Sequence, residues 1–174
     1  GYTFAGWYSE SIFTNQVSGP QSPTADATLY AKWTANTYTL TYNYNGATGG
    51  NGTSSATFTS GGAAITLPTP TKTGYTFAGW YSESIFTNLV SGAQSPTADA
   101  TLYAKWTANT YTITYSYNGA TGGNSTLTSS FTSGSTAVTL PTPTKTGYTF
   151  AGWYSESIFT NLVSGPQSPT ADAT

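Results

Sequence analysis

The octapeptide Gly-Tyr-Thr-Phe-Ala-Gly-Trp-Tyr occurs three times, at Gly1–Tyr8, Gly74–Tyr81 and Gly147–Tyr154. The copies start 73 residues apart both times, without insertion or deletion. The flanking sequence repeats too, because Gly1–Thr28 returns at Gly74–Thr101 with only two substitutions. Self-similarity at a fixed period is typical of an array of like modules and not of one large core. The octapeptide therefore decides the fold, and the rest of the chain is placed by its distance from it.

The repeat predicts one whole module between two partial ones. Residues 1–34 form the C-terminal half of a module, 38–107 form a complete module, and 111–174 form a module without its last strand. The four-residue segments 34–37 and 107–110, both Thr-Ala-Asn-Thr, are interpreted as linkers between modules. Gly1 lies inside a repeated motif and is not an initiator Met, so we expect the chain to be a piece of a longer protein.

The first half of the complete module has the pattern of β-structure. Tyr38–Asn45 alternates aromatic or aliphatic residues with Thr and Asn, which predicts a half-buried strand, and Asn45-Gly46 predicts a turn with positive φ. After a small-residue loop, a second strand is expected from about Ala56 to Leu67, and Gly61-Gly62 should split it into 56–59 and 63–67. Pro68 and Pro70 then end this strand, since Pro cannot donate to a sheet.

The second half holds the octapeptide and a closing strand. Gly74–Tyr81 carries apolar residues on both alternating faces, which predicts a strand that is covered on both sides or that twists at Gly79. Ser82–Ala100 is expected to be irregular, because Ser, Thr, Asn and Gly disfavour a helix. Ile85, Phe86, Leu89 and Val90 are its expected anchors, and Ala100–Trp106 is the expected last strand. The predicted fold class is mainly β, with small modules in an extended array and little or no helix.

Charge and composition exclude several classes of function. Charged residues make up 6% of the chain, and one period holds two acids and two lysines, so a module is formally neutral. A basic surface for nucleic acid or anionic lipid is therefore not expected. The chain has no Cys, Met or His, so disulfides cannot support the fold. No run is long and apolar enough to predict a transmembrane helix, and we expect no direct membrane insertion.

Three ordered blocks resemble a known family. Tyr38–Gly46 has the pattern Tyr-x-Leu-x-Tyr-x-x-Asn-Gly, Pro68–Tyr81 contains Pro-x-Pro-x-Lys-x-Gly-Tyr-x-Phe-x-Gly-Trp-Tyr, and Asp99–Trp106 reads Asp-x-Thr-Leu-Tyr-Ala-Lys-Trp. Together they resemble the Listeria–Bacteroides repeat, the B-repeat type of internalin-like bacterial surface proteins. The resemblance covers essentially the whole chain. It implies a compact β-grasp-like module in secreted or wall-attached bacterial proteins, without catalytic residues, although the composition of Ser82–Ala98 argues against the helix of a β-grasp fold.

The aromatic residues that end each octapeptide are the candidates for ligand binding. Trp80, Tyr81, Trp153 and Tyr154 could stack on sugar rings of host or matrix glycans if their faces were exposed. The alternative is that they form the core, because a module of about 70 residues without disulfides needs its large aromatics inside. We favour the core interpretation.

No catalytic, cofactor or metal site is predicted. Glu83 and Asp99 could in principle act as the carboxylate pair of a glycosidase, but nothing else indicates a pocket, and solubility and turn formation are the favoured roles. A metal site would need His, Cys or clustered oxygen ligands, which the sequence does not offer. An isopeptide bond between a lysine (Lys72 or Lys105) and Asn88 is disfavoured, because Lys105 is expected at the surface.

The sequence thus favours a non-catalytic structural segment of an extracellular or wall-attached bacterial protein, acting as a stalk, spacer or fibre subunit. Its expected partners are neighbouring copies of itself or adjacent repeats. A sharper hypothesis is strand exchange, in which Leu29–Trp33 of one chain completes the third module of another. The alternative function is an adhesin or carbohydrate-binding module, which requires exposed aromatics.

Overall fold

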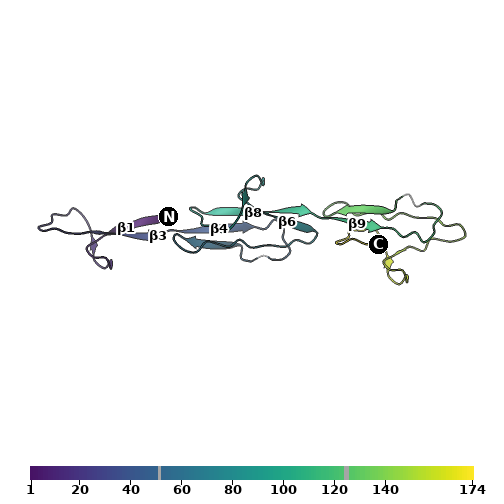
Figure 1. Ribbon diagram of the computed structural model, residues 1–174, viewed down its shortest axis with the longest axis horizontal. Helices are drawn as coiled ribbons and strands as arrows, with labels where there is room; N and C mark the ends of the chain where they lie inside the picture. The colour runs from purple at the N-terminus through teal and green to yellow at the C-terminus, as the bar shows by residue number, and fades with distance from the viewer. Residues whose placement is uncertain (51, 124–125) are drawn as a thin grey trace. The chain divides into compact units, whose positions relative to one another are not determined.

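The computed structural model describes residues 1–50, 52–123 and 126–174 (Figure 1). Among these residues it contains strands and turns and no helix, which confirms the predicted mainly-β class. The strands are β1 (Tyr2–Tyr8), β2 (Gln16–Val17), β3 (Tyr30–Ala35), β4 (Thr37–Asn43), β5 (Ser55–Thr59), β6 (Tyr75–Tyr81), β7 (Leu89–Val90), β8 (Ala100–Ala108), β9 (Thr110–Thr114), β10 (Thr128–Thr132), β11 (Trp153–Tyr154) and β12 (Leu162–Val163). They fall into two compact units, one made of residues 1–45, 50–70 and 79–105 and the other of residues 46–49, 71–78 and 106–174.

The first unit begins with a three-stranded sheet in the order β2-β1-β3. β1 and β3 are antiparallel, with Tyr2 opposite Ala35 and Tyr8 opposite Tyr30, and the register shifts between Phe4 and Gly6. The closing strand of the first partial module therefore pairs with the octapeptide of its own chain. This pairing contradicts the strand-exchange hypothesis, because β3 is already part of its own sheet.

The complete module is built on a five-stranded sheet in the order β5-β4-β8-β6-β7. β4 and β5 form an antiparallel pair with Leu40 opposite Ala56, whereas β4 and β8 run parallel with Leu40 opposite Ala100. Alternation on β4 confirms the predicted face, since Leu40 and Tyr42 are buried and Thr41 and Asn43 are exposed. A parallel pair needs a long crossover, and the residues between β4 and β8 provide it.

Two expectations about irregular segments need correction. The predicted strand 63–67 does not form, and Ile65 makes only an isolated bridge to Gln94. Two of the four expected anchors, Ile85 and Leu89, are exposed at 75% and 58%. The loop is held by other groups, so these side chains are not needed in the core.

In the second unit, β9 and β10 form an antiparallel pair in the same register as β4 and β5, with Ile113 opposite Ser129. β11 and β12 form a short antiparallel pair, and Ala173 bridges to Ile113 in parallel, as Ala100 does to Leu40. The buried residues of this unit include Ile113, Tyr115 and Phe131. The repeated sequence is therefore repeated in strand register as well.

The predicted four-residue linkers are wrong, because one residue separates the strands at each module border. β3 ends at Ala35 and β4 begins at Thr37, and likewise β8 ends at Ala108 and β9 begins at Thr110. Figure 1 shows β3 leading directly into β4. A single asparagine thus connects the two strands at each border, Asn36 between β3 and β4 and Asn109 between β8 and β9, where the sequence predicted a four-residue linker.

Candidate functional site

The tryptophan of the octapeptide lies in the core of the complete module. Trp80 is 3% exposed, and its ring lies 5.3 Å from the rings of both Tyr42 and Tyr44. Its Nε1 donates a hydrogen bond of 2.8 Å to the carbonyl oxygen of Pro68. The Pro-x-Pro segment that ends the preceding strand thus supplies the acceptor that a buried indole requires. A ring in this position offers no face to a sugar.

The equivalent tryptophan repeats this packing in the second unit. The Trp153 ring lies 5.1 Å from Tyr115 and 5.4 Å from Tyr117, and its Nε1 donates to the carbonyl oxygen of Pro141 at 2.7 Å. Trp153 is half-buried. The tyrosine pairs Tyr42/Tyr44 and Tyr115/Tyr117 therefore pack on the tryptophan of their module in the same way.

Tyr81, which follows Trp80, helps to hold the next loop against β8. Tyr81 packs edge-to-face on Phe86 at 5.6 Å, and the Lys105 ammonium lies 4.9 Å from the Tyr81 ring and 5.8 Å from the Phe86 ring. The sequence analysis expected Lys105 at the surface, but the residue is half-buried. Cation–π attraction of this kind fixes the loop to β8. Tyr154 makes the corresponding edge-to-face contact with Phe159 at 5.5 Å.

The carboxylate of Glu83 holds the same loop through hydrogen bonds. Glu83 Oε1 accepts hydrogen bonds from Thr87 N and Thr87 Oγ1, both at 2.6 Å, and from Asn88 N at 2.5 Å. Its Oε2 accepts from Ser82 Oγ. These donors, led by the Ser82 and Thr87 hydroxyls, lower the pKa of Glu83 to about 2. A general acid needs a raised pKa, so Glu83 is suited to capping a turn and not to protonating a leaving group.

The same carboxylate cap occurs in all three modules. Glu10 and Glu156 accept the equivalent bonds, and the pKa of each is lowered to about 2 by the same kinds of donor. The phenylalanine in each loop adopts positive φ, at 57° for Phe13, 59° for Phe86 and 56° for Phe159. The cap holds a conformation that is otherwise unfavourable for a bulky residue.

Asp99 has a separate structural partner. Its Oδ1 accepts a hydrogen bond of 2.7 Å from Thr39 N on β4, and Asp172 accepts from Thr112 N at 2.8 Å. The expected turn into its own strand is thus replaced by a cap on the neighbouring strand. Glu83 and Asp99 are each engaged in different hydrogen bonds, and their contacts do not form an acid–base pair.

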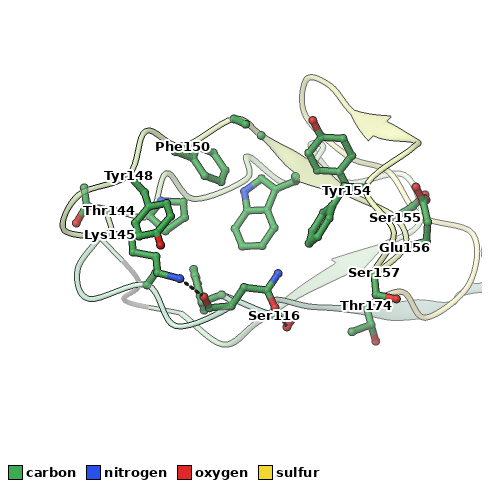
Figure 2. Close-up of a pocket in the computed structure, with 18 of the residues that line it drawn as sticks. Ser116, Thr144, Lys145, Tyr148, Phe150, Tyr154, Ser155, Glu156, Ser157 and Thr174 are labelled. Atoms are coloured by element: carbon green, nitrogen blue, oxygen red, sulfur yellow. Dashed lines mark hydrogen bonds between the residues drawn. The ribbon is translucent and has the colours of Figure 1, made fainter.

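A cavity of about 760 Å³ lies in the third module (Figure 2). Tyr148, Phe150 and Tyr154 line it together with Lys145 and Glu156, and Thr174 lies at its edge. Both charged groups are engaged, since Lys145 Nζ donates to Asn118 O at 2.9 Å and Glu156 caps its own loop. The position equivalent to Thr174 in the complete module is Thr101, which lies in β8, and Leu102 and Ala104 of that strand are buried.

Within the described residues, no group of three or more His, Cys, Asp or Glu side chains could hold a metal ion. The lysines considered for an isopeptide bond lie against aromatic rings. Lys72 Nζ is 4.6 Å from the Tyr75 ring, and Lys105 covers Tyr81, while the Asn88 side chain donates to Thr87 Oγ1.

The residues that the sequence analysis missed are Asn36 and Asn109. Asn109 N donates to Gly74 O at 2.9 Å, and Asn109 O accepts from Ser133 N at 2.9 Å. Its Oδ1 accepts from Thr76 Oγ1 at 2.7 Å, and its Nδ2 donates to Tyr111 OH at 3.2 Å.

Asn36 repeats these four bonds, to Gly1, Ser60, Thr3 and Tyr38. We call this four-bond arrangement the asparagine clamp. The signal that could have revealed it is the same Asn between two strands at the repeat period.

The sequence matches the Listeria–Bacteroides repeat domain in three segments, residues 1–32, 38–105 and 111–174. The chain belongs to the Listeria–Bacteroides repeat family. Two relatives of this repeat chain are proteins of Evansella cellulosilytica that are named as putative membrane proteins, one of them Gly-rich, with 34% and 32% identity. Each alignment covers 92% of the chain but only 24% and 18% of the relative.

A third relative is Internalin H of Listeria monocytogenes, which is 41% identical over 88 residues, 49% of this chain and 15% of the relative. The repeat segment therefore spans about a quarter or less of these curated relatives. No solved structure matches the chain. Within the described residues, no helix is long and apolar enough to cross a membrane.

Proposed function

We propose that this repeat segment is a non-catalytic spacer of an extracellular or wall-attached bacterial protein, built from modules that are joined without a hinge. The observation that carries the proposal is the asparagine clamp, because all four polar groups of the border residue are bonded. A connection of one residue has little conformational freedom to begin with. With both main-chain and side-chain groups bonded, bending would break several hydrogen bonds together.

The clamp joins the end of one module to the start of the next. In the second unit it ties the octapeptide, through Gly74 and Thr76, to the hairpin of the following module, through Ser133 and Tyr111. Tyr75 extends this contact, since a side chain on Gly134 would meet its hydroxyl at 2.6 Å. In the first unit, Tyr2 OH donates to Ser60 O at 3.3 Å in the same way.

The remaining features suit a spacer better than an enzyme. The carboxylates cap loops, the lysines cover aromatic rings, and the strand edges are rich in Thr and Asn. We propose that adjacent repeats are the main partners of each module and that surface location follows from the family and from the Internalin H relative. We also propose that the modules are β-grasp-like and that the segment can serve as a fibre subunit, whereas adhesion belongs to the alternative function.

Small-angle X-ray scattering of chains with two, three and four added repeats tests the proposal. The maximum dimension should increase by a constant increment for each repeat. In the matched series with Gly in place of the clamp Asn at every border, the increment should shrink. Equal growth in both series, or compact particles in the first, would overturn the spacer function.

The second candidate is an adhesin or carbohydrate-binding module, which requires exposed aromatics. Phe4, Trp7 and Trp33 are 45%, 47% and 57% exposed. Their rings meet edge-to-face, Phe4 with Trp7 at 5.6 Å and with Trp33 at 5.4 Å, so they do not form one flat platform. Glycan-array binding that is lost in Trp33→Ala would support this candidate, and absence of binding would remove it.

A further inference from the structure

One edge of the five-stranded sheet is long and unprotected. The sheet ends in β7 on one side and in β5 on the other. β7 has two residues, whereas β5 has five and pairs with β4 in an unbroken register. Natural sheets protect their edges with very short strands, lysines, prolines or bulges. β7 is protected by its length, but β5, whose five residues Ser-Ala-Thr-Phe-Thr the structure describes in full, has none of these devices.

The main-chain groups of β5 alternate between the two sides of the strand. Hydrogen bonds of 2.8 Å from Tyr42 N to Ser54 O and of 2.9 Å from Ser60 N to Asn36 O bracket its ladder with β4. Bonded and non-bonded pairs alternate along an antiparallel ladder. Even-numbered residues from 54 to 60 therefore bond to β4, and the odd-numbered residues direct their N–H and C=O groups outward.

Thr57 is the centre of this outward edge. Thr39, its partner in the ladder, donates its own N–H to Asp99 Oδ1 at 2.7 Å and not to Thr57. Thr57 is exposed, and no hydrogen bond joins its N–H or C=O group to any residue that the structure describes. The carbonyl oxygens of Ser55 and Thr59 each accept one local hydrogen bond and, with two lone pairs, can accept another. The edge can thus bond to a further strand.

The third module has the same edge. β10 pairs with β9 in the same register as β5 with β4, and Ser130, the equivalent of Thr57, is exposed. β10 reads Thr-Ser-Ser-Phe-Thr, so it too carries no charge and no proline. The edge is therefore a property of the module and not of one position in the chain.

We propose that the outer edge of β5 pairs in antiparallel orientation with the β5 edge of a second copy of this chain, so that one sheet extends across both copies. This inference rests on the fibre-subunit part of the proposed function. The outward groups are symmetric about Thr57, so a two-fold rotation places Thr57 opposite Thr57 and Ser55 opposite Thr59. The exposed face then gains Thr–Thr and Ser–Thr pairs, which stabilise antiparallel strands.

Charge and size indicate how such a partner binds. An identical strand brings identical charges, so self-pairing requires an uncharged edge, and β5 meets this requirement. An uncharged edge also offers no electrostatic complementarity to a charged peptide. A single five-residue edge is small against the roughly 1,200 Å² that a stable specific interface buries at least. Pairing should therefore be reversible and should depend on concentration.

Sedimentation velocity of the 174-residue chain at rising concentration tests the proposal. The native chain should shift reversibly from monomer toward larger species. Thr57→Lys combined with Ser130→Lys places like charges opposite each other at both edges, so this variant should stay monomeric. Thr41→Lys combined with Thr114→Lys is the matched control, because both threonines are exposed on the adjacent strands and the added charge is the same. The control should associate as the native chain does, and far-UV circular dichroism checks that each variant is folded.

Disulfide cross-linking tests the register without a change of charge. The chain contains no Cys, so Thr57→Cys should form a covalent dimer in a glutathione buffer several-fold faster than Thr41→Cys, and urea should remove the difference. The Cα atoms of a bonded antiparallel pair lie about 5.5 Å apart, which is within the range of a disulfide.

Four results would overturn the proposal: a native chain that stays monomeric, an edge variant that associates like the native chain, a control that loses association equally, or equal cross-linking at the two positions. The growth of the maximum dimension with repeat number tests the spacer function independently of these results.

Discussion

Replacing Trp80 with Ala should destabilise the chain far more than the same replacement at Trp7, although both lie in the same octapeptide. Trp80 is 3% exposed and Trp7 is 47% exposed. Truncating a buried tryptophan removes its transfer free energy and leaves a cavity, which costs about 3–5 kcal/mol. Trp80→Ala also leaves the Pro68 carbonyl without its donor.

At Trp7 the loss is mainly the edge-to-face contact with Phe4, which corresponds to about 1 kcal/mol. Urea denaturation followed by far-UV circular dichroism, together with calorimetry, measures both losses. Trp80→Phe is a milder variant that keeps an aromatic ring but loses the hydrogen bond, and it covers the case in which the alanine variant does not fold. Equal free energies of unfolding for the two alanine variants would refute the assignment of Trp80 to the core.

Three further predictions concern the loop and the octapeptide. The pKa of Glu83 is lowered to about 2, below its ordinary value of 4.5. The stabilisation that Glu83 gives the loop is therefore present above pH 4.5 and is lost as the pH falls toward about 2. In an NMR titration, the chemical shifts of the loop residues should change only below pH 4.5, and this change should be absent in Glu83→Gln. Lys105→Gln should cost about 0.5–1 kcal/mol, through loss of the cation–π contact with Tyr81, as measured by thermal unfolding; an unchanged midpoint would contradict this contact. Gly79→Ala should cost about 1–3 kcal/mol in urea denaturation, because Gly79 has φ of 128° and the new Cβ would lie 2.6 Å from Leu89 Cδ1, and a neutral effect would show that the strand does not need this conformation.

The sequence predicted the elements whose signal is local. Alternation from Tyr38 to Asn45 indicated both the strand and its buried face, and Asn45-Gly46 indicated a turn with positive φ. The two apolar faces of the octapeptide predicted either a strand covered on both sides or a twist at Gly79, and Gly79 has a positive φ of 128°. Family membership followed from three ordered blocks, and a comparison with protein families confirmed it.

Features that depend on distant partners were not predictable in this way. Glu83 lies beside Ser82 and four residues from Thr87, but the cap accompanies a positive φ at Phe86, which no residue type in the loop indicates. Ile85 and Leu89 fitted an apolar pattern, yet both are exposed. The hydrogen bonds of Glu83 and the contact of Lys105 with the Tyr81 ring hold the loop without them.

The asparagine clamp was missed for a related reason. Thr-Ala-Asn-Thr has the composition of a flexible connection, and its partners Gly74 and Ser133 lie 35 residues before and 24 residues after Asn109. No local pattern marks bonds of that range. A polar residue that recurs between two strands at the repeat period is the pattern to examine in related chains.

The most direct test of the central claim is the distance distribution between two spin labels on consecutive modules. The chain contains no Cys, so Ser84→Cys and Ser157→Cys, at exposed equivalent positions, provide the two labelling sites. Double electron–electron resonance should give one narrow distribution that broadens when Asn109 is replaced with Gly. A distribution that is already broad with Asn109 in place, or one that stays narrow in the Gly variant, would contradict the account that the clamp joins the modules without a hinge.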